Sequence, residues 1–201
     1  MLLFAVGAGK APRGLPDKSK KSSNLMSQLI VLSAIGTDRT GVVQDISKVI
    51  LGCGGNIEES RMTTLGNEFA VLMLVSGNWH TLSRLEKGLE KLTEDADLTF
   101  AIRKTSSRKV SEDRMPYAVD VVCLDQQGIV YALANFFAAR GIEIADVATR
   151  RYAAAHTGAP MFAVQMAINV PSSINLALLR DDFFDMADRM NLDAILDPVK
   201  A

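Results

Sequence analysis

Two nearly continuous apolar runs, at residues 28–35 and 69–75, stand out in the first half of the chain. Runs without polar alternation are typical of central strands covered on both faces, and we expect both segments to be such strands. Between them, apolar residues recur at helical spacing, and a glycine cluster then predicts the end of a helix. The apolar positions are Val42, Val43, Ile46, Val49, Ile50 and Cys53, and the glycines are Gly52, Gly54 and Gly55.

The pattern continues with a hairpin and a second helix. Residues 56–64 are predicted to form a strand, and Leu65–Gly66–Asn67 a hairpin turn into the strand at 69–75. A second amphipathic helix follows, marked by Leu82, Leu85, Leu89 and Leu92, and residues 97–104 make a fourth strand. The order β-α-β-β-α-β is that of a ferredoxin-like fold, so the predicted fold class is α+β.

The second half repeats this order. Predicted strands lie at 117–124, 142–152, 161–170 and 192–199, and Ser172 or Ser173 is the predicted cap of the last helix. Equivalent glycines and apolar residues of the two halves are separated by 87 residues without a gap through the first helix. The pairs are Asp38 with Asp125, Gly41 with Gly128, Ile46 with Leu133, Gly54 with Gly141, and Ile57 with Ile144. We therefore predict two ferredoxin-like domains in tandem, at 27–104 and 117–199, joined by a linker at 105–116.

Residues 1–26 are rich in Gly, Pro, Lys and Ser and show no helical or strand period, so we predict a disordered leader. Met26, directly before the first strand, is a possible native start. The segment lacks the basic start of a signal peptide, and the chain has no apolar run near the roughly 20 residues that span a bilayer. Cys53 and Cys123 lie among apolar residues and are predicted to be buried, unpaired thiols of a cytoplasmic protein.

The net charge of -1 and pI near 6.1 argue against autonomous binding of nucleic acid, because phosphate-binding domains carry a basic face. An effect on gene expression would then pass through a protein partner. Enzyme signatures are absent as well: His80 and His156 have no partner at metal-ligand spacing, and no nucleophile motif or phosphate-binding glycine loop occurs. Adjacent carboxylates at 58–59 and 181–182 are expected to be solvated. We predict no enzyme, no cofactor and no metal.

One stretch does suggest a binding site, the glycine-bounded turn at 36–41. It contains Thr37, Asp38, Arg39 and Thr40 and ends at Gly41. Asp38 or Thr40 could cap the following helix and leave other N–H groups for a ligand carboxylate, while Gly41 would permit close approach and Arg39 would donate. The alternative is that the turn only caps a helix, and spacing leaves both open.

Asn56, at the start of the next strand, strengthens the ligand hypothesis because its amide can both donate to and accept from an amino acid. It could equally be an ordinary residue following a turn. The second copy departs from the pattern, with Asp125, Gln126, Gln127 and Gly128 in the turn and Glu143 in place of Asn56. Glu143 would repel a carboxylate but could meet an ammonium group, so we expect a weaker, different site there.

The motif Gly36-x-Asp38-Arg39-x-Gly41 followed by Gly55-Asn56-Ile57 resembles the ACT domain, a regulatory module that binds amino acids. Two such domains over about residues 27–199 resemble the glycine cleavage system transcriptional repressor family. The resemblance implies domains that pair by sheet faces or edges, with ligands at the interface of two domains. Its ligand-binding residues would be those from Thr37 to Gly41, together with Asn56 and Ile57.

The resemblance further implies a repressor that senses glycine and acts through a DNA-binding activator, without contacting DNA itself. Our leading hypothesis is therefore a non-enzymatic, homo-oligomeric regulator that binds no membrane. A regulatory subunit acting in trans on an amino-acid metabolic enzyme is the alternative, and a purely structural dimerisation module is a third.

Overall fold

The computed structural model describes residues 28–107 and 113–199. The chain divides into two compact units, Met1–Arg108 and Lys109–Ala201, and each is described by itself. The predicted disordered leader at 1–26 lies outside the described residues.

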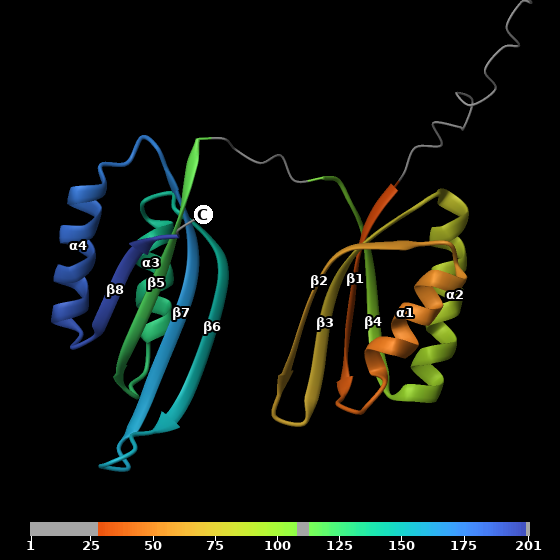
Figure 1. The fold of residues 1–201 in the computed structure, drawn as a ribbon, viewed down its shortest axis with the longest axis horizontal. Coiled ribbons are helices and arrows are strands. Elements are labelled where there is room, and N and C mark those ends of the chain that lie inside the picture. Colours follow the sequence, from red (N-terminus) through yellow and green to blue (C-terminus); the bar gives the residue numbers. More distant parts are fainter. Residues whose placement is uncertain (1–27, 108–112, 200–201) are drawn as a thin grey trace, which may run out of the picture. The chain divides into compact units, whose positions relative to one another are not determined.

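Unit 1 is a four-stranded antiparallel sheet in the order β2-β3-β1-β4, with both helices on one face (Figure 1). Its elements follow the predicted β-α-β-β-α-β order: β1 (Gln28–Thr37), α1 (Val42–Gly52), β2 (Asn56–Leu65), β3 (Glu68–Gly77), α2 (Trp79–Ala96) and β4 (Leu98–Thr105).

Unit 2 repeats the arrangement, with sheet order β6-β7-β5-β8. Its elements are β5 (Arg114–Leu124), α3 (Ile129–Ala138), β6 (Glu143–Ala153), β7 (Pro160–Pro171), α4 (Leu176–Arg189) and β8 (Asp193–Pro198). Together the two units confirm the predicted α+β class and the tandem ferredoxin-like repeat.

Alternate residues of the central strands build the core of each unit. In β1, Ile30, Leu32 and Ala34 are buried under the helices, where they meet residues such as Ile46 of α1 and Leu85 of α2. The one-sided burial follows from the two-residue repeat of a strand, which sends successive side chains to opposite faces.

The opposite face of the central strands is not covered within unit 1. Ile35 of β1 and Leu72 of β3 are each 52% exposed there. The second of the two predicted covers is therefore not supplied within unit 1 itself. The runs combine a core-facing row with an apolar row on the open face of the sheet.

One strand start and one helix cap in unit 2 differ from the prediction by more than one residue. The strand expected to begin at residue 117 begins at Arg114, because residues 114–116 pair with the end of β7. The cap of α4 is neither of the predicted serines. Asn175 takes that role, and its side-chain oxygen accepts from the N–H groups of Ala177 at 3.0 Å and Leu178 at 3.3 Å.

Candidate functional site

The predicted binding turn begins later than its sequence suggests, because Gly36 lies inside β1 rather than in the turn. An alanine Cβ built at Gly36 would lie 2.2 Å from the backbone oxygen of Asp97, so this glycine serves the close approach of β1 to the α2–β4 junction. The turn proper comprises Asp38, Arg39 and Thr40, and α1 begins after Gly41.

Gly41 is the N-cap of α1, with a φ of 94° in the left-handed region, and no side-chain cap hydrogen bond forms among the described residues. The prediction that Asp38 or Thr40 caps the helix is therefore wrong. Because the first N–H groups of a helix lack partners within it, this end of α1 presents donors to an anion, although the Val42 N–H also donates to the carbonyl of Arg39 at 3.4 Å.

The side chains around the turn already have partners inside the unit. Arg39 Nη2 lies 2.7 Å from Asp45 Oδ2, an ion pair of two exposed side chains, and Thr37 Oγ1 lies 3.2 Å from Asp97 Oδ2. The Asp38 N–H donates to the carbonyl of Asn67 in the β2–β3 hairpin at 2.9 Å. Arg39 must leave Asp45, or share it, to meet a ligand carboxylate. The exchange costs little because exposed ion pairs are weak.

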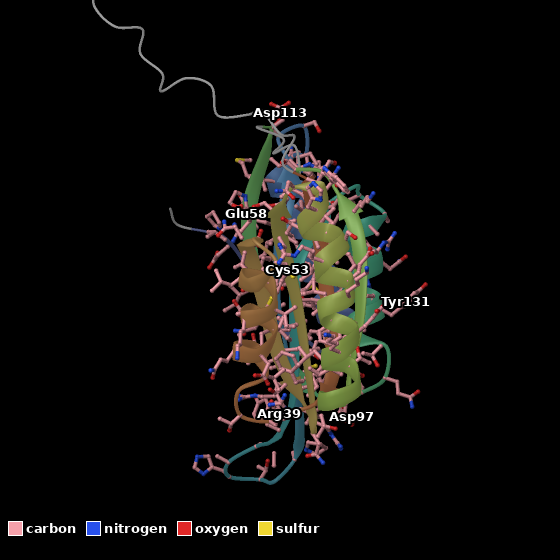
Figure 2. All side chains as sticks on the ribbon, turned by 90° about the vertical axis from the view of Figure 1, so that its right-hand side faces the viewer. Arg39, Cys53, Glu58, Asp97, Asp113 and Tyr131 are labelled. Atoms are coloured by element: carbon pink, nitrogen blue, oxygen red, sulfur yellow. The ribbon has the colours of Figure 1, made fainter. Side chains whose placement is uncertain are left out.

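Asn56 lies at the other end of the sheet. It pairs with Ser76 of β3, which pairs with Leu29 of β1, eight residues before Thr37. At about 3.3 Å per strand residue, the two positions are about 26 Å apart. Figure 2 shows the same separation, with Arg39 and Asp97 at one end of unit 1 and Glu58 nearer the other. The structure does not bring Asn56 and the turn together within one unit.

Asn56 is instead part of a polar cluster with Glu58 and Ser76. Its Nδ2 donates to Glu58 Oε1 at 3.0 Å, and the Ser76 hydroxyl donates to the same oxygen. These two hydrogen bonds, that of Ser76 first, hold the pKa of Glu58 below its usual value. Glu58 is therefore a bonded carboxylate, not merely a solvated one. Ile57, between them in sequence, packs against the core of unit 1.

The side chains of the second copy of the turn already have partners within unit 2. Asp125 Oδ2 lies 2.7 Å from Arg151 Nε, and Gln126 Nε2 donates to the carbonyl of Met190 at 3.0 Å. Gly128 has a φ of 88° and, like Gly41, begins its helix with no side-chain cap hydrogen bond in the described part of the chain. Gln127 lies in the same turn.

The counterpart of Asn56 is engaged too. Glu143 Oε2 lies 3.4 Å from both Arg114 Nη1 and Asn169 Nδ2. An ammonium group, which the sequence left as a possible partner of Glu143, would have to compete with the guanidinium of Arg114.

Sequence reasoning missed Asp45, Asp97, Glu58 and Ser76 as partners of the predicted site residues. Glu58 had a local signal, since it follows Asn56 by two positions in one strand, and Asp45 lies in the first turn of the helix that follows Arg39. Asp97 and Ser76 had none, because their proximity depends on strand pairing.

The two histidines lie on the surface, as expected. His80 belongs to α2 rather than to a turn, and its ring stacks on that of Trp79 at a centroid distance of 3.5 Å. Across residues 28–107 and 113–199, no group of three or more His, Cys, Asp or Glu side chains is placed to hold a metal ion. No helix in that same part is long and apolar enough to cross a membrane.

Comparison with known proteins agrees with this architecture. The ACT domain family model matches residues 28–103. The chain is 28% identical over 170 residues to the glycine cleavage system transcriptional repressor of Escherichia coli (strain K12), over 85% of this chain and 90% of that protein. A UPF0237 protein of Methanocaldococcus jannaschii is 43% identical over 76 residues, 37% of this chain and 84% of that protein.

A crystal structure of a candidate glycine cleavage system transcriptional repressor has a TM-score of 0.68 and 27% identity, covering 88% of this chain and 99% of that chain. The similarity thus extends over both units, in sequence and in fold. The chain belongs to the ACT-domain proteins, carries two such domains in tandem, and resembles the glycine cleavage system transcriptional repressor.

Proposed function

We propose that this protein is a non-enzymatic regulator of glycine cleavage genes that senses a small amino acid, glycine first among them, and acts through a DNA-binding partner. The observation that carries the proposal is the similarity to the Escherichia coli repressor over 85% of the chain, which includes both units. The chain's charge of -1 agrees with action through a partner, because direct phosphate binding favours a basic surface.

The turn of unit 1 is the site that we assign to the ligand carboxylate. Helix α1 begins there after Gly41 without a side-chain cap among the described residues. Its first amide donors are therefore open to a ligand, except that the Val42 N–H also donates to the carbonyl of Arg39 at 3.4 Å. The guanidinium of Arg39, 42% exposed as a side chain, is close enough in sequence and space to add a charged donor.

Asn56 lies too far from the turn to share one ligand with it inside unit 1. One amino acid spans about 3.6 Å of extended chain, far less than the distance between Asn56 and the turn within a domain. A single glycine therefore cannot touch both groups of one domain. We assign the primary contact to the turn and treat Asn56 as a separate test.

The second turn is the weaker candidate. Asp125 and Gln126 are both engaged, with Arg151 and with the carbonyl of Met190. A ligand would have to displace interactions that unit 2 makes within itself, whereas in the first turn only the exposed Arg39–Asp45 pair must yield.

Isothermal titration of the full chain with glycine, serine and alanine tests the sensor. Gly41→Ala adds a Cβ at the helix start and strains a residue with φ of 94°, so we expect binding at least about tenfold weaker, about 1.4 kcal/mol. Gly128→Ala is the matched control, with φ of 88° in the second turn, and should leave the main binding event unchanged. Absence of heat with every amino acid, or equal losses in both variants, would overturn the assignment.

Arg39→Ala should weaken binding as well, whereas Gln127→Ala should change it less. Asn56→Ala tests whether the opposite end of the domain takes part.

Co-purification from the native cell identifies the partner. A DNA-binding regulator as the main protein recovered supports the proposal. A metabolic enzyme in that position would instead favour the alternative of a regulatory subunit acting in trans.

A further inference from the structure

The two helices of unit 1 pack closely at Gly88 of α2. A Cβ built on Gly88 would lie 2.8 Å from Cγ1 of Val49 on α1 and 3.8 Å from Sγ of Cys53, the C-cap of α1. A contact of 2.8 Å is shorter than carbon atoms tolerate, so the seam between α1 and α2 requires a residue without a side chain.

Backbone landmarks give the equivalent positions of unit 2. Gly54 and Gly141 both have positive φ after the first helix of their unit, 87 residues apart. Asp97 and Asn191, 94 residues apart, are the two non-glycine residues with positive φ in the described part, and each precedes the last strand of its unit by one or two residues. An offset of 87 residues therefore relates α1 to α3, and an offset of 94 residues relates α2 to α4.

The seam of unit 2 is built from larger residues. Phe136, Arg140 and Asp182 occupy the positions of Val49, Cys53 and Gly88. The Arg140 guanidinium lies 3.8 Å from the centroid of the Phe136 ring and pairs with Asp182 Oδ2 at 2.8 Å. Asp182 is thus an ion-paired residue of the seam rather than a solvated carboxylate. The side chains of Phe136, Arg140 and Asp182 thus lie between α3 and α4, whereas α1 and α2 pack directly against each other at Gly88.

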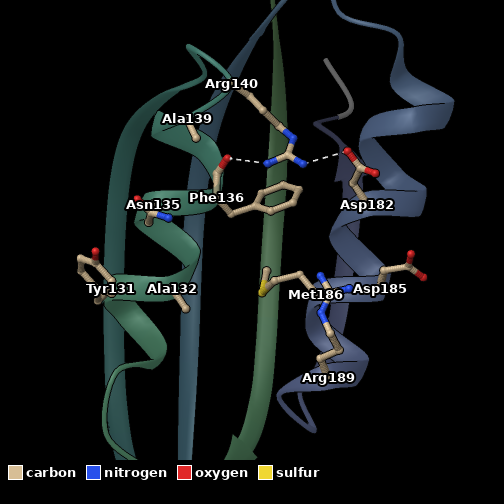
Figure 3. A pocket seen from close by; sticks show the side chains of 10 residues that line it. All are labelled: Tyr131, Ala132, Asn135, Phe136, Ala139, Arg140, Asp182, Asp185, Met186 and Arg189. Carbon is tan, nitrogen blue, oxygen red and sulfur yellow. Dashed lines mark hydrogen bonds and ion pairs between the residues drawn. The ribbon is translucent and has the colours of Figure 1, made fainter.

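A groove of about 420 Å³ results, lined by α3 and α4. This volume lies within the range of small-molecule pockets. Figure 3 shows the Arg140–Asp182 pair across one end and Met186 pointing from α4 toward α3. Phe136 supplies an apolar wall, and Tyr131, 75% exposed, lies at the edge on α3.

The two arginines and two aspartates that line the groove balance in formal charge, so binding of an anion depends on which arginine lacks an ion pair. Arg140 is already paired with Asp182, and its Nη1 donates to the carbonyl of Phe136 at 3.2 Å. Arg189, in the last turn of α4, also lines the groove, and no described carboxylate forms an ion pair with it. Asp185, the remaining charged lining residue, extends to the side of α4 that faces away from α3 (Figure 3).

We propose that the α3–α4 groove of unit 2 binds small organic carboxylates with a large apolar or aromatic body. Arg189 would hold the carboxylate, since a guanidinium offers paired donors of fixed geometry, and Phe136 and Met186 would contact the apolar body. This site is on the helical face of unit 2. It shares no residue with the turn of unit 1 and does not depend on amino-acid sensing there.

NMR titration of the isotope-labelled full chain with 3-phenylpropionate tests the site. We expect shifts confined to α3 and α4 and binding at least tenfold tighter than that of 3-phenylpropanol, which lacks the charge, or propionate, which lacks the ring. Arg189→Gln should weaken binding at least tenfold, because it removes a charge-assisted hydrogen bond. Arg84→Gln, an exposed arginine of α2 in unit 1, is the control and should change nothing.

Ala132→Leu, which narrows the groove from α3, should also abolish binding while Arg189 stays in place. Equal affinity for 3-phenylpropanol, or an unchanged affinity in Arg189→Gln, would overturn the proposal. Tighter binding of the acidic peptide acetyl-Asp-Phe-amide than of 3-phenylpropionate would also overturn it, since the groove would then be a protein-docking site.

Discussion

Replacing Gly36 by alanine tests the tertiary role of a residue that resembles part of a binding motif. The added Cβ would lie 2.2 Å from the carbonyl oxygen of Asp97, 2.9 Å from Leu98 Cδ2 and 3.1 Å from Leu98 Cα. Two of these three atoms belong to the backbone, and Leu98 is 1% exposed in the core. The chain must therefore move where β1 and β4 pair, at Gly36 and Leu98.

The magnitude follows from three contributions. Overpacking of a filled site costs about 1–3 kcal/mol, and a backbone obstacle favours the upper half of that range. Opening the terminal Gly36–Leu98 pair adds about 1 kcal/mol for a lost hydrogen bond. Alanine restricts the unfolded chain more than glycine does, and this effect offsets about 0.4–1 kcal/mol of the lost stability. We expect unit 1 to lose about 2–3.6 kcal/mol, equivalent to about 8–29 °C in its Tm for a domain of this size.

Trp79 makes the measurement specific for unit 1. It is the single tryptophan of the chain and begins α2, so its fluorescence in a urea titration follows the unfolding of that unit. The readout is the free energy of unfolding from the midpoint and slope of the transition.

Two substitutions serve as controls. Gly52→Ala, at an exposed position of α1 with no described atom within 4 Å of the new Cβ, should stabilise unit 1 by about 0.4–1 kcal/mol. Cys123 of unit 2 occupies the position of Gly36, and there the β5–β8 register ends one pair earlier, at Val122 and Asp193. Cys123→Ala should therefore leave the unit 1 transition in place. If Gly36→Ala were as stable as the wild type, the close approach to Asp97 would not be what requires glycine.

Three further predictions concern local chemistry. Ser76→Ala should raise the pKa of Glu58, measured by NMR titration, because it removes the first of the two hydrogen bonds that lower this pKa. The stability that these bonds give the fold is present above the unfolded-state pKa of Glu58 and is lost as pH falls through the folded-state pKa, so the variant should lose less stability on acidification. An unchanged pKa of Glu58 would contradict this prediction. Cys123 should react with iodoacetamide more slowly than Cys53, because burial first and the charge of Asp125 second raise the pKa of the Cys123 thiol, whereas Cys53 is only partly buried. Mass spectrometry of the labelled peptides gives the order of reaction, and faster labelling of Cys123 would refute the prediction. Asn175→Ala should cost unit 2 about 1 kcal/mol in thermal denaturation through loss of the α4 cap, and an unchanged Tm would contradict the assigned cap.

The repeat and the order of its elements follow from local sequence patterns alone. Helix starts and ends depend on nearby residues, so Gly54 and Gly141 mark the same helix end in both copies. Strand assignment likewise needed only short apolar runs. Even there, the sequence does not distinguish Ser172 and Ser173 from the actual cap, Asn175, because several capping residues close together cannot be told apart without the backbone path.

The roles of the motif residues depend on contacts between elements far apart in the chain. Gly36 and Asn56 belong to one sequence motif, yet the first serves close packing against Asp97 and the second lies about 26 Å from the turn. The groove between α3 and α4 could not be predicted from the sequence for the same reason, since it depends on how closely Gly88 and Asp182 allow their two helices to pack. Spacing along a chain encodes local structure, whereas distances between paired strands and packed helices depend on register and side-chain volume across the fold.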